Sequence, residues 1–169
     1  MTKKLWTICL MAIFALSATA QTHIGKWEST PETDQDGTIV LVFNFINKKD
    51  IEVGVSVSMS DEETDLSFDI TTPGTYTIED SKLFLNIDTP NTKIDIKKLQ
   101  FKGETADAIK ENPDLEKTIR NMVNIAVKDQ KDEILKELPV DGGFVIKELT
   151  STRMVLSEND ETFILNKVK

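Results

Sequence analysis

The amino-acid sequence predicts a mainly β protein: an antiparallel, up-and-down β-barrel of about 8–10 strands that one long α-helix interrupts. Apolar and polar residues alternate along most of residues 21–169, and turn-forming residues separate the alternating runs. The apolar spacing changes to three and four residues only near residues 112–138. Alternation of period two is typical of strands with one buried and one solvated face, and short consecutive strands with tight turns favour an antiparallel meander.

The strands are predicted from runs of this alternation. The clearest run is Ile51 to Ser60, where apolar residues alternate with glutamate, glycine and serine. Asp80-Ser81 predicts a tight turn, and Pro73-Gly74 is expected to separate two strands. The predicted strands span residues 25–30, 38–47, 51–60, 66–70, 75–79, 82–88, 93–102, 144–150, 152–158 and 162–168.

The run from Lys93 to Lys102 changes phase in its middle. Ile94 and Ile96 occupy even positions, whereas Leu99 and Phe101 occupy odd ones. One extra residue near Lys97-Lys98 would keep all four side chains on one face. The run therefore predicts a β-bulge at that point.

The long helix is predicted over residues 112–138. Asn112 is a favoured N-cap, Pro113 suits the first helical position, and Pro139 ends the pattern. Glu104 to Glu111 is expected to form a short separate helical turn. One apolar stripe predicts packing against the sheet, with a protein partner as the alternative occupant; its members are Leu115, Ile119, Met122, Val123, Ala126, Ile134, Leu135 and Leu138.

Residues 1–20 are typical of a signal peptide. Lys3 and Lys4 precede the short apolar run Leu5 to Leu16, and Ala18-Thr19-Ala20 supplies the small residues that a signal peptidase requires. The run is shorter than the roughly 20 apolar residues of a membrane-spanning helix. We therefore expect cleavage after Ala20, export to the periplasm or the medium, and no transmembrane segment.

The processed chain, residues 21–169, has no cysteine. Cys9 lies within the signal peptide and position 21 is Gln, so no lipid anchor is expected, and no disulfide can form. The remaining 149 residues suit one domain. The formal net charge is −9 for the whole chain, and loss of two lysines and no acidic residue takes it to −11. That charge disfavours nucleic acid and anionic lipid as partners.

A family resemblance begins at Ile24-Gly25-Lys26-Trp27, on the first predicted strand. A Gly-x-Trp at that place, followed by an up-and-down meander, resembles the lipocalin superfamily. It resembles more closely the small lipocalin-like exported proteins of Bacteroidetes-type bacteria. Gly74 to Asp80 and Leu149 to Leu156 resemble their middle and closing hairpins.

The resemblance implies that Gly25 and Trp27 lie at a closed barrel end, with a basic residue of a late strand against the indole. Arg153 or Lys167 could supply it. The resemblance also implies a small apolar ligand inside the barrel. The helix is a departure, because lipocalins usually carry theirs near the end of the chain. This puts the barrel mouth in question, since the helix is long enough to cover or fill it.

No residue pattern in the sequence predicts an enzyme. His23 is the only histidine and is expected in a frayed terminus, so a catalytic triad, a Cys-His pair and a zinc site all lack parts. Glu32-x-Asp34-x-Asp36-Gly37 has Phe43 where a calcium loop needs glutamate. A pair of carboxylates remains open, but 29 acidic residues make such a pair unspecific. We expect no catalysis, no cofactor and no metal.

The expected function is binding of a small apolar molecule within the barrel. Its candidate residues lie on faces predicted to point inward, with Tyr76 as a polar group: Phe43, Phe45, Val55, Phe68, Tyr76 and Leu85. The alternative is an interaction or envelope-scaffold module with a solid barrel core, contacting a protein through its loops or the 112–138 helix. A central void would favour binding, and an apolar patch on the outer helix face would favour the alternative.

Overall fold

The computed structural model describes residues 23–33, 37–137 and 143–169, and it confirms the predicted fold class. The predicted signal peptide, residues 1–20, lies outside the described residues. All the strand pairings are antiparallel. In the described ranges the strands are β1 (Gly25–Ser29), β2 (Glu32–Thr33), β3 (Thr38–Phe45), β4 (Asp50–Ser60), β5 (Thr64–Glu79), β6 (Lys82–Ile87), β7 (Lys93–Phe101), β8 (Gly143–Leu149), β9 (Arg153–Glu158) and β10 (Glu161–Lys167).

Eight of these strands close a barrel. Their order is β1-β10-β9-β8-β6-β5-β4-β3, and β1 completes the ring because it pairs with both β10 and β3. β2 adds to the edge of β3, and β7 pairs with β5 outside the ring. Neighbouring strands of the ring mostly follow one another in sequence, as the meander predicts. The interruption is the segment between β6 and β8 that carries β7 and the helices.

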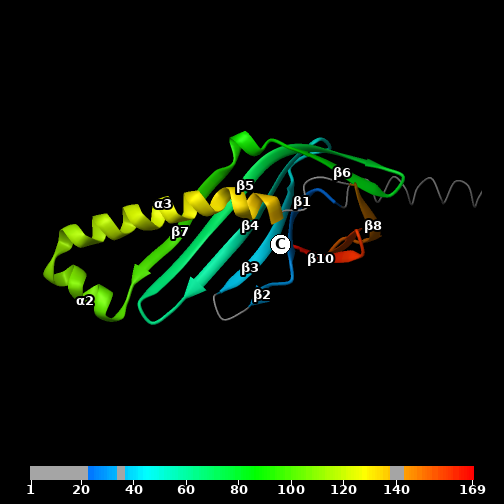
Figure 1. Ribbon diagram of the computed structural model, residues 1–169. Coiled ribbons are helices and arrows are strands. Elements are labelled where there is room, and N and C mark those ends of the chain that lie inside the picture. The colour runs from blue at the N-terminus through cyan, green and yellow to red at the C-terminus, as the bar shows by residue number, and fades with distance from the viewer. Residues whose placement is uncertain (1–22, 34–36, 138–142) are drawn as a thin grey trace, which may run out of the picture.

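β4 and β5 extend beyond the barrel and form an arm with β7, α2 (Gly103–Glu111) and α3 (Pro113–Glu137) (Figure 1). The predicted bulge in β7 is confirmed: Ser67 pairs with Lys98 and Phe68 with Ile96, so Lys97 is the extra residue. In Figure 1 α3 lies across the strands of the arm. The arm therefore has its own helix-on-sheet packing, separate from the ring.

The predicted strand break at Pro73-Gly74 is wrong, because β5 runs through it without interruption. The Pro73 carbonyl accepts a hydrogen bond from Asp88 N–H at 2.8 Å, so its backbone faces the edge where β6 and β7 lie. At this point β5 exchanges β7, whose pairing ends at Thr71, for β6, whose pairing begins at Gly74. Pro73 lies between these two pairings, so the N–H that proline lacks is not needed for a hydrogen bond to either strand.

The helical region differs from the prediction in two respects. α2 is a full helix rather than a single turn, and the apolar stripe of α3 is used only in part. Val123 and Val127 pack on the sheet, while Met122 is 63 % exposed. Arg120 lies on the same side of the helix as Val123 and Val127, and its guanidinium lies 5.4 Å from the centre of the Phe101 ring of β7. Leu138, the predicted end of the helix, lies outside the described residues.

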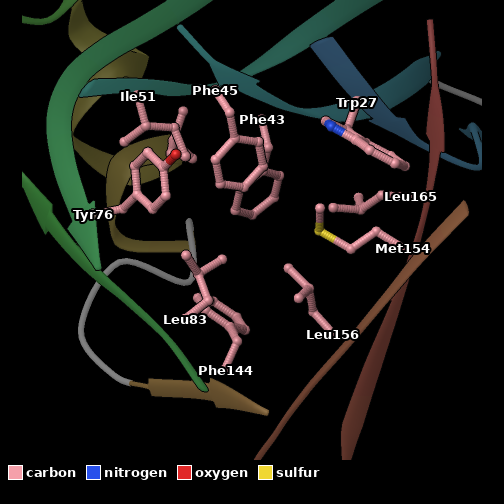
Figure 2. Close-up of a cluster of buried hydrophobic side chains, with 11 residues drawn as sticks. Trp27, Phe43, Phe45, Ile51, Tyr76, Leu83, Phe144, Met154, Leu156 and Leu165 are labelled. Carbon is pink, nitrogen blue, oxygen red and sulfur yellow. The ribbon is translucent and has the colours of Figure 1, made fainter. Parts of the chain in front are cut away.

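Two hydrophobic clusters hold the molecule together. The arm cluster consists of Val55, Val57, Phe68, Ile70 and Val127. The barrel cluster fills the ring from opposite walls (Figure 2) and consists of Trp27, Phe43, Phe45, Ile51, Val53, Tyr76, Leu83, Phe144, Met154, Leu156 and Leu165. An eight-stranded barrel has an interior only just wide enough for side chains. These large side chains occupy it.

Candidate functional site

A pocket of about 830 Å³ opens at one end of the barrel, beside Tyr76. We call this the Tyr76 end; it is formed by the start of β1, the β3–β4 turn, the β5–β6 hairpin and the end of β8. Among the described residues, β6 and β8 pair through Lys82–Phe84 and Gly143–Val145. The register of β8 with β9 also shifts between Ile146 and Glu148. Ile146 N–H donates to the Ser81 carbonyl at 2.8 Å, and β8 then continues to Leu149 past the β5–β6 hairpin; residues of both segments line the pocket.

The walls of this pocket are apolar and its rim is charged. Ile78 belongs to β5, and Ile146 and Leu149 belong to β8, where they pack against the barrel cluster. The rim carries two cations and two anions on exposed or half-buried side chains: Lys48, Lys147, Asp80 and Glu148. The rim therefore has no net charge, in contrast to the acidic chain as a whole.

His23 and Tyr76 form the floor, since they are only 6 % and 4 % exposed. The Tyr76 hydroxyl donates to the Asn47 carbonyl at 2.6 Å. Its oxygen also lies 2.7 Å from His23 Nε2. A hydroxyl has one proton, so the histidine must be the donor of the second bond, which places its proton on Nε2.

This floor is tied to the first strand. Trp27 Nε1 donates to the His23 carbonyl at 2.6 Å. The His23 ring meets Phe45 and Tyr76 edge-on, with ring centres 5.5 and 5.6 Å apart. Burial raises the pKa of Tyr76 to about 12, so its hydroxyl keeps its proton at neutral pH.

The expectation that His23 lies in a frayed terminus is therefore wrong. Its position just before β1 brings it over the barrel end, where it fills the space between Phe45 and Tyr76. No local signal in the sequence indicates this, because the partners are 22 and 53 positions away along the chain.

Trp27 is fully buried, and Lys167 is the basic residue that packs on it. The Lys167 Nζ lies 5.3 Å from the centre of the Trp27 indole, because the two residues are directly paired on β1 and β10. Gly25 has a φ of +118°, and a Cβ there would lie 3.1 Å from Lys167 Cε. Arg153 does not reach the indole; it is exposed and forms an ion pair with Glu148.

The six cavity candidates are divided between two places. Phe43, Phe45 and Tyr76 belong to the barrel cluster, and Leu85 is half-buried against it. Val55 and Phe68 do not face the barrel interior; they lie in the arm cluster, under α3. β4 and β5 leave the ring near Gly54, so one continuous strand face serves two cores. Tyr76 is the candidate that lines the pocket.

Four other residues that line the pocket were not predicted as ligand-binding residues: the apolar Ile78, Ile146 and Leu149 of the walls, and His23 of the floor. Ile78, Ile146 and Leu149 have the same alternation as any core-facing strand residue, so their sequence does not distinguish a pocket wall from a packed interior. What makes them a pocket wall is the place where β8 passes the β5–β6 hairpin, which is a tertiary feature. Within the described ranges, no three His, Cys, Asp or Glu side chains come together in a way that could hold a metal ion.

Neither a comparison with protein-family models nor a search of curated proteins finds a match for this chain. None of the helices in the described residues is both long enough and apolar enough to cross a membrane.

Proposed function

We propose that this protein binds a small, largely apolar molecule without transforming it, in the pocket at the Tyr76 end, after export from the cytoplasm. The observation that carries the proposal is the pocket itself. Its volume of about 830 Å³ suits a small ligand. The aliphatic side chains of Ile78, Ile146 and Leu149 form its walls, and the rings of His23 and Tyr76 form its floor. Export follows from the predicted signal peptide, residues 1–20.

The packed ring changes the expected position of the ligand. Phe43, Phe45 and Phe144 are nearly or completely buried, and the Phe43 ring centre lies 6.5 Å from that of Phe45 and 6.2 Å from that of Phe144. A ligand in the centre of the ring would have to displace them. The pocket at the end requires no such rearrangement, because its walls are already separated.

The same end of the barrel supports a relationship to the lipocalin-like exported proteins. Gly25-x-Trp27 lies on the first strand, with the indole buried and Lys167 across its face. We propose that the chain belongs with that group, and that its ligand site has moved from the usual central cavity to the barrel end.

The proposal is tested with N-phenyl-1-naphthylamine, a neutral apolar probe whose fluorescence rises on transfer from water. The processed chain is expected to bind it at micromolar concentrations and to show quenching of Trp27, its single tryptophan. Ile78→Lys should weaken binding about tenfold or more, because it buries a charge against an apolar ligand. Ile125→Lys is the matched control, since Ile125 is 59 % exposed on α3.

Equal effects of the two lysine variants would exclude the pocket as the site. Absence of binding by the probe and by a broad panel of lipids and metabolites would refute ligand binding altogether.

A second candidate function is favoured by the outer face of α3. Met122 and Ile125 project from it and are 63 % and 59 % exposed. We propose, as the alternative to ligand binding, that this face contacts another exported protein through an apolar surface. A photo-crosslinking residue at Ile125 should then give one discrete adduct in the export compartment, and the same residue at exposed Thr162 should give none. Identical adduct patterns at both positions would refute this role.

A further inference from the structure

The polar floor of the pocket has a fixed hydrogen-bond direction. Tyr76 donates its single proton to the Asn47 carbonyl and accepts one bond from His23 Nε2. A phenolic oxygen can accept a second hydrogen bond, so what remains to Tyr76 is an acceptor site and no donor. His23 Nε2–H is already used in the bond to Tyr76.

The Asn47 carbonyl cannot easily turn away, because the β3–β4 turn around it is closely bonded. The Asn47 side-chain oxygen accepts from the N–H groups of Lys49 and Asp50, at 2.8 and 2.9 Å. Its Nδ2 donates to the Asp50 carboxylate at 2.8 Å. The turn is also attached to β5, because Tyr76 N–H donates to the Lys49 carbonyl at 2.9 Å. The direction of the Tyr76 O–H bond is therefore set by the turn.

An acidic or purely accepting ligand group finds no donor at this depth. Apart from His23, the side-chain donors of the pocket lie on exposed residues at the rim: the Lys48 and Lys147 ammonium groups and the Ser81 hydroxyl. A carboxylate pushed to the floor would lose its water and face the lone pairs of Tyr76. A buried polar group without a partner costs about 1–3 kcal/mol, and a charged one costs more.

The following inference rests on the proposed function. We infer that the pocket selects neutral apolar molecules with a hydrogen-bond donor at the end that enters first. The donor is a hydroxyl or an amine N–H. The donor bonds to Tyr76 Oη, and the apolar body lies against Ile78, Ile146 and Leu149. An anionic group, where a ligand has one, stays at the rim near the two lysines.

Three naphthalene probes of one shape test this inference by titration calorimetry on the processed chain. 2-Naphthol has a donor, 2-methoxynaphthalene has the same oxygen without its proton, and 2-naphthoate is an anion. 2-Naphthol should bind about three- to tenfold more tightly than 2-methoxynaphthalene, as expected for one net hydrogen bond. 2-Naphthoate should bind more weakly than 2-naphthol.

Tyr76→Phe is the informative variant, because it keeps the ring and removes the acceptor. It should bind 2-methoxynaphthalene as the wild type does and lose the preference for 2-naphthol. Equal binding of these two probes by the wild type, or a preference that survives in Tyr76→Phe, would overturn the inference and leave the proposed function standing. Failure of all three probes while N-phenyl-1-naphthylamine binds would overturn this inference alone; failure of N-phenyl-1-naphthylamine and the broad panel as well would overturn the proposed function with it.

A measurement without ligand tests the same hydrogen-bond direction and does not depend on the folding of a variant. His23 is the only histidine, so its imidazole nitrogens can be assigned directly in a ¹⁵N NMR spectrum. The neutral ring should carry its proton on Nε2. A proton on Nδ1 would mean that Tyr76 donates to the histidine instead, and the inference would then be wrong.

Discussion

Replacing Phe144 by alanine tests whether the ring is solid. The Phe144 side chain is 0 % exposed, and its ring meets Phe43 and Phe163 edge-on with centres 6.2 and 6.0 Å apart. Truncation of a buried phenylalanine costs about 3–5 kcal/mol, and each aromatic contact adds about 0.5–1.5 kcal/mol beyond buried area. We expect a loss of about 4 kcal/mol in the free energy of unfolding, and a fall in Tm of roughly 10 °C.

Phe84 provides the matched control. It lies opposite Gly143, the residue just before Phe144, but its side chain is 41 % exposed. Phe84→Ala should cost about 1 kcal/mol or less. The assay is urea unfolding of the processed chain followed by Trp27 fluorescence, with an unchanged slope m as the sign that only stability has changed. Equal costs for the two variants, or a cost below about 1 kcal/mol for Phe144→Ala, would mean that the ring holds a void and not a packed core.

Three further predictions concern single residues. The pKa of Tyr76 is raised from its usual 10 to about 12 in the folded state. The stability that this shift contributes is therefore complete below pH 10 and is lost as the pH rises toward 12. In urea titrations the free energy of unfolding of the wild type should fall by about 1–2 kcal/mol from this cause, and Tyr76→Phe should not show this loss. Lys167→Met should lower the free energy of unfolding by about 0.5–1 kcal/mol, measured by thermal melting, because it removes the cation–π contact with Trp27. Arg153→Met breaks a surface ion pair and should change the stability by less in the same assay. Gly54→Ala should destabilise the protein by about 2 kcal/mol or more in chemical unfolding, because its Cβ would lie 1.9 Å from a main-chain oxygen of β5; an unaffected variant would contradict the close approach of the two strands.

Some features of the fold could be predicted because their causes are local. Alternation of apolar and polar residues decides which strand face is buried, whatever the neighbours are. The bulge at Lys97 followed from the phase change between Ile96 and Leu99, since a strand can keep both on one face only by adding a residue. The start of α3 at Pro113 was predictable for the same reason, because proline favours the first turn of a helix.

Other expectations failed where a distant partner decided the outcome. Pro73-Gly74 was expected to separate two strands, but the change of neighbour from β7 to β6 removes the need for the Pro73 N–H. Met122 was expected in the core, but the side of the helix that carries Val123 and Val127 faces the sheet instead. His23 was expected to be frayed, but Tyr76 and Phe45 enclose it.

The amino-acid pattern alone was enough to predict a β meander with an inserted helix, whose first strand carries Gly25-x-Trp27. The three-dimensional packing was needed to show that one face of β4 and β5 is shared between two cores, which assigns Val55 and Phe68 to the arm. It also decided where the pocket lies. The pocket is lined by residues from the start of the described chain, the β3–β4 turn, the β5–β6 hairpin and β8, and these distant segments are brought together by the closure of the whole ring, which no local pattern records.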